Sequence, residues 1–291
     1  MREHLCGTPE SIYHSDKVPR SANLYADSAH FLFELIQNAD DNEYAVPTPT
    51  LNITYKESFR GRRLRIDCNE VGFSKSNVES ICSISESSKI GNGRRGKYIG
   101  EKGMGFKSVF AGSEVVWIHS GYYSFKFINN DSQDFGMIVP HWDRFPQKTL
   151  PGHTSILLEL TPGRSTESLV GKLRSMNPSF LMFLRSLRQI NIELRNTRPV
   201  ILKRRDSRLE GSKLKTVTVY RGTESTEYAM FQQQVSKLPH DPRRKGVTQT
   251  ELVLAFPLGE PSKSTNRNVE HVHAFLPIRD YGFKVSCHSA R

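Results

Sequence analysis

The stretch from Phe31 to Glu43 carries the residues whose types and spacing best suit chemistry. Glu34, Asn38 and Asp41 recur at intervals of four and three residues, so on a helix they lie within roughly 60° of one another. A carboxylate and an amide oxygen one turn apart suit a magnesium ion that keeps several waters and touches phosphates. An amphipathic helix with a polar edge is the plainer interpretation. The apolar residues of the adjoining stripe are Phe31, Leu32, Leu35, Ile36 and Ala39.

A glycine-rich stretch, GEKGMGF, follows some sixty residues later and favours the chemical interpretation. Gly100, Gly103 and Gly105 form the pattern G-x-x-G-x-G before a segment that can form a helix. Glycines let backbone N–H groups approach an anion, and a helix N-terminus adds partial positive charge. The stretch lacks the Lys-Ser/Thr ending of a P-loop, and it differs from the dinucleotide pattern G-x-G-x-x-G.

ELIQNADD followed by GEKGMGF resembles the ATP-binding domain of the GHKL superfamily, which includes DNA gyrase, the ninety-kilodalton heat-shock chaperone, histidine kinases and MutL. The first stretch resembles its N-box and the second its second glycine box. Within the superfamily the motifs most resemble those of the sacsin and NO VEIN-like group, in the stretches ELIQNADD, NEVGFS and IGEKGMGFKSVF. The resemblance spans roughly Leu24 to Leu160.

The resemblance implies an α+β fold: a two-layer α/β sandwich (the Bergerat ATP-binding fold) followed by a partial second α/β domain. Its mixed, mostly antiparallel sheet would be covered on one face by helices at 24–43, 76–85 and 104–112. The expected domains are an N-terminal lead-in at 1–20, the ATP-binding domain at 21–163 and the partial second domain at 164–291.

The resemblance also assigns roles. Glu34 would be the general base that activates water, and Asn38 the magnesium ligand. Gly100, Gly103 and Gly105 would cradle the phosphates. The remaining expected nucleotide contacts are Lys102 in the glycine box, Lys89 in a basic segment that resembles a mobile lid, and Asp41, Asp67, Asn69, Gly72, Met104, Phe106 and Thr154.

One position departs from the superfamily pattern. The aspartate of D-x-G-x-G, which receives the adenine amino group, is replaced by Cys68 in IDCNEVGFS. A thiol does not match a carboxylate as a hydrogen-bond acceptor. Asp67, Asn69 and Glu70 are the candidates for the missing contact, and a turn residue after a strand is the plainer interpretation of Asp67.

Composition indicates which ligands and which cellular location to expect. The 291 residues carry a net charge of +11, which suits a polyanion such as ATP or nucleic acid, or else a solvated basic surface. No run of 18 apolar residues predicts a membrane span. Four cysteines without C-x-x-C spacing indicate reduced thiols in an intracellular protein, with cytoplasm and nucleus unresolved.

Period-two patterns predict strands on both sides of the domain boundary. One or two helices broken at Pro178 are expected over 165–188, and polar loops around 204–214 and 236–250. The predicted strands are 51–55, 63–67, 113–120, 122–129, 136–142, 152–160, 190–194, 216–220, 251–258 and 271–278.

The leading functional hypothesis is a magnesium-dependent ATP-binding module. It would be a slow ATPase of chaperone-like or assembly-machine type, with ATP as ligand and proteins as clients or partners. A non-hydrolysing nucleotide-binding switch is one alternative. A DNA-associated ATPase of gyrase or MutL type is another, suggested by the basic charge, although nucleic acid is not the favoured partner.

Overall fold

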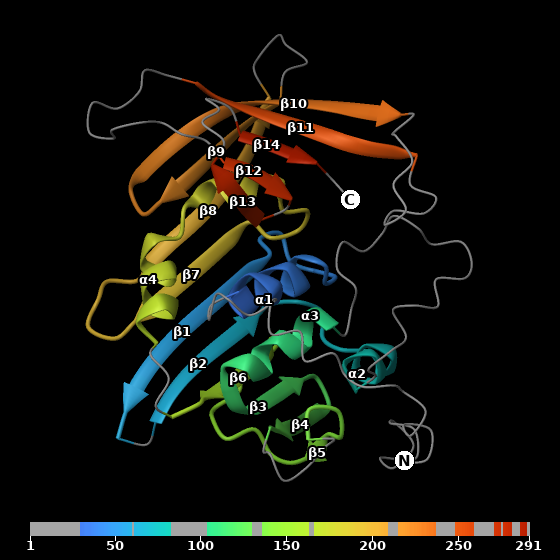
Figure 1. The fold of residues 1–291 in the computed structure, drawn as a ribbon, viewed down its shortest axis with the longest axis vertical. Coiled ribbons are helices and arrows are strands. Elements are labelled where there is room, and N and C mark those ends of the chain that lie inside the picture. Colours follow the sequence, from blue (N-terminus) through green and yellow to red (C-terminus); the bar gives the residue numbers. More distant parts are fainter. Residues whose placement is uncertain are drawn as a thin grey trace. The chain divides into compact units, whose positions relative to one another are not determined.

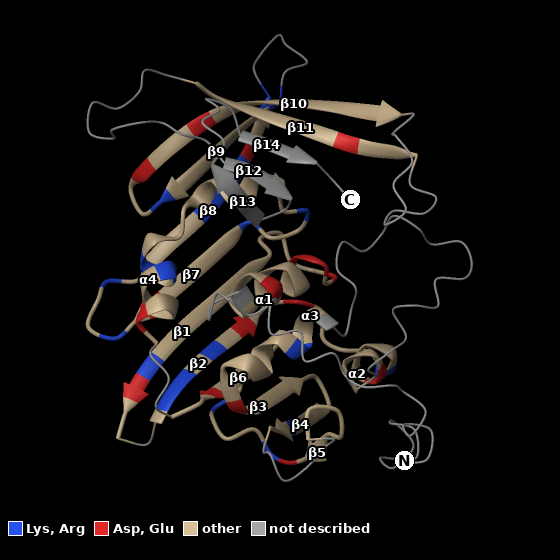
Figure 2. Ribbon diagram, in the orientation of Figure 1, with Lys and Arg blue, Asp and Glu red and all other residues tan. Residues whose placement is uncertain are grey.

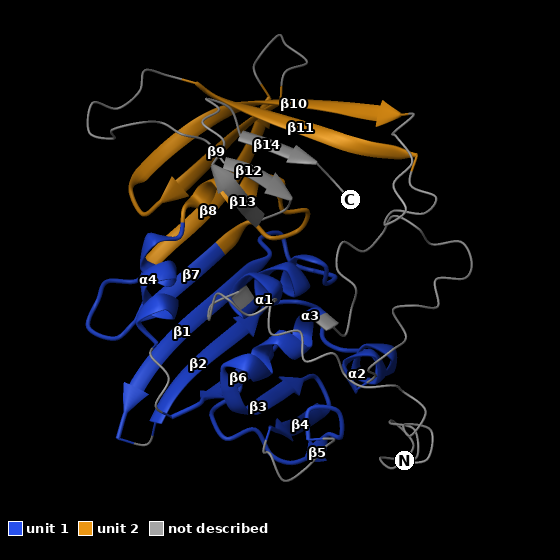
Figure 3. Ribbon diagram, viewed as in Figure 1, with its two compact units in different colours: residues 1–176, 190–199 blue, residues 177–189, 200–291 orange. Residues whose placement is uncertain are grey.

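A computed structural model gives the structure of the chain in two compact units, coloured separately in Figure 3. Unit 1 comprises Met1–Met176 and Ile190–Pro199, and unit 2 comprises Asn177–Gln189 and Val200–Arg291. The structure describes residues 30–59, 61–82, 104–129, 136–162, 166–208, 215–236, 248–258, 271–274, 276–280 and 286–289. The expected lid and four expected site residues lie outside these ranges: Lys89, Gly100, Lys102 and Gly103.

Unit 1 is built on a sheet with the strand order β7-β1-β2-β6-β3-β4-β5 (Figure 1). From β1 to β5 along this order, neighbouring strands pair antiparallel. Alternate residues of β1 and β2 are buried, as expected for a sheet with two different faces. The bounds are β1 Thr50–Ser58, β2 Gly61–Cys68, β3 Ser113–Ser120, β4 Tyr123–Ile128, β5 His141–Trp142, β6 Thr154–Leu160 and β7 Gln189–Leu194.

Short helices accompany this sheet. The first, α1 (His30–Asp40), buries the apolar stripe predicted from the sequence and contacts α3 (Met104–Lys107). Lys107 ties α3 to the last turn of α2 (Lys75–Cys82), because its Nζ donates to the Ile81 carbonyl at 2.7 Å. The remaining elements are the 3-10 helix η3 (Ser108–Ala111) and α4 (Glu167–Ser175).

Unit 2 contains strands in the order β13-β12-β14-β11-β10-β9-β8 and one 3-10 helix, η4 (Pro178–Phe183). The neighbouring strands of this order pair antiparallel, except that β12 and β14 pair parallel. Its core joins Met182 and Phe183 of η4 to apolar residues of β9, β10 and β11. The bounds are β8 Val200–Arg208, β9 Lys215–Arg221, β10 Glu224–Ser236, β11 Gln249–Leu258, β12 His271–Ala274, β13 Leu276–Asp280 and β14 Ser286–Ser289.

The predicted fold class is wrong. The described chain is dominated by sheet, with fourteen strands and only four α-helices, and is not a two-layer α/β sandwich of Bergerat type. Unit 2 likewise is not an α/β domain, since its described elements are strands and η4. The sequence showed little sign of β8 and β10, because both contain polar runs, KRRDSR and QQQ, that lack apolar alternation. The loop predicted from 204 begins inside β8.

No helix in the described ranges is both long and apolar enough to cross a membrane. The expected intracellular location stays a prediction.

Arg204 holds η4 against β8 in unit 2. Its Nη1 donates to the carbonyls of Leu181, Met182 and Leu184 at 2.7–3.0 Å, and its Nη2 lies 2.8 Å from Asp206 Oδ1. The guanidinium is buried, so these carbonyls have little access to water. Arg204 is therefore the central polar tie of this unit.

We expect Arg204→Met to destabilise unit 2 by about 3 kcal/mol, because three carbonyls and a carboxylate lose a charged donor. Both tryptophans lie in unit 1, so the readout is hydrogen exchange of the β9–β11 amides. The matched control is Arg208→Met, an exposed arginine of the same strand. Equal exchange in the two variants would show that the tie is dispensable.

Candidate functional site

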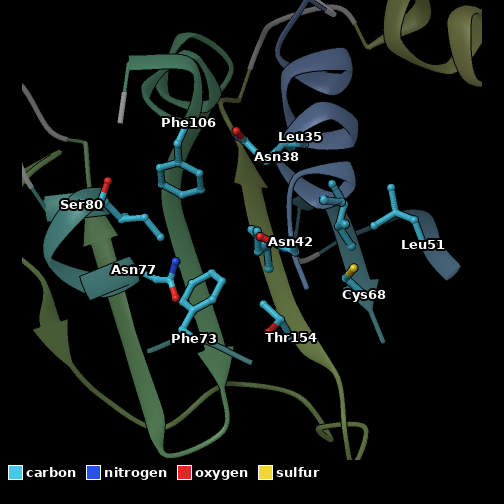
Figure 4. A pocket seen from close by; sticks show the side chains of 14 residues that line it. Leu35, Asn38, Asn42, Leu51, Cys68, Phe73, Asn77, Ser80, Phe106 and Thr154 are labelled. Atoms are coloured by element: carbon cyan, nitrogen blue, oxygen red, sulfur yellow. The ribbon is translucent and has the colours of Figure 1, made fainter. Parts of the chain in front are cut away.

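A pocket opens in unit 1 among α1, α2, α3 and the strands β1, β2 and β6 (Figure 4). Its volume is about 80 Å³. The walls are mostly apolar, with a small number of amide, hydroxyl and thiol groups, which is the usual make-up of a small-molecule site. The lining residues are Leu35, Asn38, Ala39, Asn42, Leu51, Ile66, Cys68, Phe73, Asn77, Ser80, Ile81, Phe106, Thr154 and Ile156.

The polar edge of α1 meets α3 at Glu34 and Gly105. A Cβ atom built on Gly105 would lie 2.5 Å from Glu34 Oε2, closer than real Cβ atoms approach. Glycine is therefore required for this carboxylate to stay where it is. The two stretches that resemble the N-box and the second glycine box thus meet at Glu34 and Gly105. Gly103 lies outside the described residues, and the side chain of Met104 is not described.

Asn38 lines the pocket one turn after Glu34. Within the described chain its Nδ2 is buried and has no hydrogen-bond partner. Leaving a buried donor unsatisfied costs about 1–3 kcal/mol, so such groups are rare unless something else satisfies them. Asn42 lies one turn further along and also lines the pocket (Figure 4).

Cys68 lines the pocket at the end of β2, and its thiol is paired with Tyr44. The Tyr44 hydroxyl donates to the Ala39 carbonyl at 2.6 Å and lies 3.0 Å from Cys68 Sγ. Because the phenol proton is used on Ala39, the thiol proton points to the Tyr44 oxygen. The sulfur therefore offers the pocket a weak acceptor and no donor. Burial raises the pKa of the Cys68 thiol from 9.0 to about 12 and also raises the pKa of Tyr44.

Thr154 pairs with Cys68 across the ladder of β2 and β6. Its hydroxyl lies 2.6 Å from that of Ser120, which accepts the Phe73 N–H at 2.7 Å. Ser120 is fully buried, and either hydroxyl of the pair could be the donor. When Ser120 donates to Thr154, the Thr154 proton is free to point into the pocket. In that arrangement the pocket presents a donor beside the acceptor of Cys68.

Glu34 and Gly105 are not among the lining residues, and four further expected contacts also lie away from the pocket lining. Asp67 faces the other side of the sheet, where Arg65 binds both its oxygens and Ser155 Oγ donates to it at 2.5 Å. Asn69 accepts from Thr50 N at 2.7 Å and so joins the end of β2 to the start of β1. Gly72 adopts φ +97° in the following turn, and Asp41 is likewise absent from the lining.

The sequence did not single out Tyr44, Asn42, Phe73, Asn77 and Ser80. Asn42 continues the spacing of Glu34 and Asn38, which was a usable signal. Asn77 carried a weaker signal, because it forms a reciprocal cap with Ser74 at the start of α2. Ser74 N donates to Asn77 Oδ1 at 2.8 Å, and Asn77 N donates to Ser74 Oγ at 3.3 Å. Tyr44 had no signal, since its role depends on a contact 24 residues away.

Comparison with known proteins supports the resemblance to the NO VEIN-like group. The chain is 32% identical over 287 residues to Protein NO VEIN of Arabidopsis thaliana. This similarity covers 91% of the chain and 10% of that protein, so the chain spans about a tenth of the length of this relative. No protein-family model matches the chain.

The Cys68 thiol makes the free energy of unfolding depend on pH in the alkaline range. Its pKa is raised on folding, so between pH 9.0 and about 12 the unfolded chain releases a proton that the folded chain retains. Stability is therefore full below pH 9 and falls with rising pH, by up to about 1.4 kcal/mol per pH unit. Tyr44 acts in the same direction above its ordinary value of 10.0.

We expect urea unfolding at pH 8 and pH 11 to show a smaller loss of stability for Cys68→Ala than for the parent. Val78→Ala, a truncation of an equally buried residue that does not titrate, should lower stability by the same amount at both pH values. The raised pKa of the buried Cys68 thiol is wrong if Cys68→Ala and the parent lose the same stability between the two pH values.

Proposed function

We propose that this chain is a magnesium-dependent ATP-binding module of GHKL type and a slow ATPase of chaperone-like or assembly-machine type. One observation carries the proposal: Asn38 Nδ2, at the wall of the pocket, is buried and has no hydrogen-bond partner in the described part of the chain. Glu34 is one turn away and is in contact with the last glycine of the glycine box. A donor without a protein partner is accounted for if a ligand satisfies it.

The polarity of the pocket favours adenine. The amino group of adenine is a donor beside a ring nitrogen that accepts, whereas guanine has the reverse order on the same edge. Cys68 offers an acceptor, and Thr154 offers a donor when Ser120 donates to it, side by side on paired strands. An adenine amino group on the sulfur and a ring nitrogen on the Thr154 hydroxyl would satisfy both.

The size of the pocket fits only a part of the nucleotide. Sites that enclose drug-sized ligands have volumes of ~300–1,000 Å³, well above the 80 Å³ found here. A base between Phe106, Ile66 and Ile156 would be held mainly by apolar contact. The ribose and phosphates would then lie outside the pocket.

Asn38 and Glu34 would have different tasks. Magnesium neutralises phosphate charge during phosphoryl transfer and is normally held by one or two protein oxygens plus phosphates and waters. Asn38 Oδ1 suits that ligand set, and no group of three or more His, Cys, Asp or Glu side chains in the described chain could hold a metal. The Glu34 carboxylate would take a proton from the attacking water.

A nucleotide-binding switch without turnover is the second candidate. It is favoured by Cys68, because a sulfur acceptor holds the adenine amino group more weakly than the carboxylate it replaces. Binding would then depend on the apolar walls, and closure over ATP would change contacts with a partner.

We expect Asn38→Ala to lose magnesium-dependent ATP binding by about tenfold or more, because alanine offers the ion no ligand. The measurement is calorimetric titration with ATP in the presence and absence of magnesium. Gln37→Ala is the matched control, since it removes an amide from the same helix outside the pocket lining. Unchanged affinity for magnesium-ATP in Asn38→Ala would refute the metal assignment.

We expect Glu34→Ala to keep ATP affinity within several-fold and to lose about 10²-fold in single-turnover hydrolysis, the usual size of a general-base contribution. Gly105→Ala should reduce turnover as well, because its Cβ displaces the same carboxylate. If the parent binds ATP without hydrolysing it, or if Glu34→Ala hydrolyses ATP as fast as the parent, the ATPase proposal is wrong and the nucleotide-binding switch takes its place.

A further inference from the structure

A second, larger cavity lies on the face of the unit 1 sheet that Asp67 occupies. Its volume is about 940 Å³, and its floor is formed by alternate residues of β1 and β2, among them Thr54, Arg63 and Arg65, with Lys56 of β1 at the rim. Cys68 and Asp67 are consecutive residues of a strand, so this groove and the smaller pocket lie on opposite faces of the sheet. Its walls come from Gln147–Lys148 and the turn Arg195–Thr197.

The floor of the groove is rigid and already neutral at its centre. Arg65 binds Asp67 through Nε and Nη2 at 2.8–3.0 Å, donates to Gln147 Oε1 at 2.9 Å, and lies 5.6 Å from the centroid of the Phe145 ring. An arginine held by several partners fixes the position of its neighbours on the strand. The charge available to a ligand therefore comes from the rim.

The rim carries a surplus of positive charge. Lys56, Lys148 and Arg195 are exposed and form no ion pair in the described chain, against one such carboxylate, Glu193. Arg195 donates to the backbone carbonyl of Glu57 at 3.0 Å, which orients the guanidinium without neutralising it. Figure 2 shows the Lys and Arg residues along β2 and the adjoining part of β1.

One rim cation, Lys56, lies directly opposite a cation of the floor, Arg63. Lys56 and Arg63 are cross-strand partners in the register of β1 and β2. Like charges at directly opposed positions destabilise a sheet. Glu159 of β6 reduces the repulsion between Lys56 and Arg63 only in part. It lies 3.5 Å from Arg63, on the side away from Lys56, and the side chains of Arg63 and Glu159 are both about one-third exposed. A carboxylate placed between Lys56 and Arg63 would remove the repulsion.

We propose that this groove is a binding site for an acidic polypeptide segment of a partner protein. The rim cations supply charge complementarity, which speeds association and sets orientation. The interspersed Glu193 and Glu57 would repel a continuous phosphate backbone, whereas a peptide carries separated carboxylates. Gln147, Asn196 and Thr197 supply amide and hydroxyl groups for peptide hydrogen bonds. The site is independent of the nucleotide pocket.

The test is fluorescence anisotropy of the full chain with a labelled oligoglutamate peptide at low salt, beside an oligolysine peptide and a short DNA duplex. The double variant Lys56→Glu/Lys148→Glu reverses two exposed rim charges that have no ion pair to lose. The matched control is Lys203→Glu/Arg208→Glu, two exposed residues of β8 with the same change in net charge.

We expect the parent to bind oligoglutamate and not oligolysine, the rim variant to bind about tenfold more weakly or worse, and the control to stay within about twofold. Equal losses in both variants would mean attraction to the net charge alone. Tighter binding of the duplex, with the same loss in the rim variant, would mean a nucleic-acid site. Either result, or no binding of oligoglutamate, overturns the proposal.

Discussion

The pairing register of β2 is the constraint on which both faces of unit 1 depend. Successive strand residues point to opposite faces, so Asp67 and Cys68 cannot share a site. The register is locked from one side by Asp67, which is 4% exposed and bound by Arg65 and Ser155. A slip of one residue would move the Arg65–Asp67 pair together to the apolar face and away from Ser155 of β6, and burying these charges there would cost several kcal/mol. It would also expose Leu64 and Ile66 from the apolar face.

This constraint decides what kind of chemistry the pocket offers. With Cys68 at the end of the strand, the pocket has a sulfur acceptor whose proton is directed to Tyr44, beside the Thr154 hydroxyl, which is a donor when Ser120 donates to it. Much of its binding energy must come from apolar walls such as Phe106 and Ile156. The same register places Asp67 on the other face, where Arg65 and Asp67 form the floor of the basic groove.

Local patterns in the sequence predicted some elements well. The stripe Phe31 to Ala39 is buried along α1, as its period indicated, and β3 occupies Ser113–Ser120 as predicted from its alternation. Asn38, Phe106 and Thr154, taken from the resemblance, all line one pocket. The helix stripe and the strand were predictable because their periods are local properties of the chain, whereas the roles of Asn38, Phe106 and Thr154 as nucleotide contacts stay predictions.

The remaining features depend on contacts distant in sequence. The strands β8 and β10 are stabilised by pairing with β9, so their polar runs gave no warning and the fold class was wrong. Asp67 was a reasonable candidate for the adenine contact, yet Ser155, 88 residues away, contributes to holding it on the opposite face. Lys89, Gly100, Lys102 and Gly103 lie outside the described residues, so their predicted roles rest on the resemblance.

We propose that the pocket between α1, the end of β2 and the start of β6 holds the base of ATP. The most direct measurement is amide hydrogen exchange with magnesium-ATP, with magnesium alone and with magnesium-GTP. The account predicts that ATP slows exchange in α1, in residues 69–73 and at the start of β6, and that GTP does so far less. Protection by ATP confined to other strands, or none at saturating ATP, would contradict it.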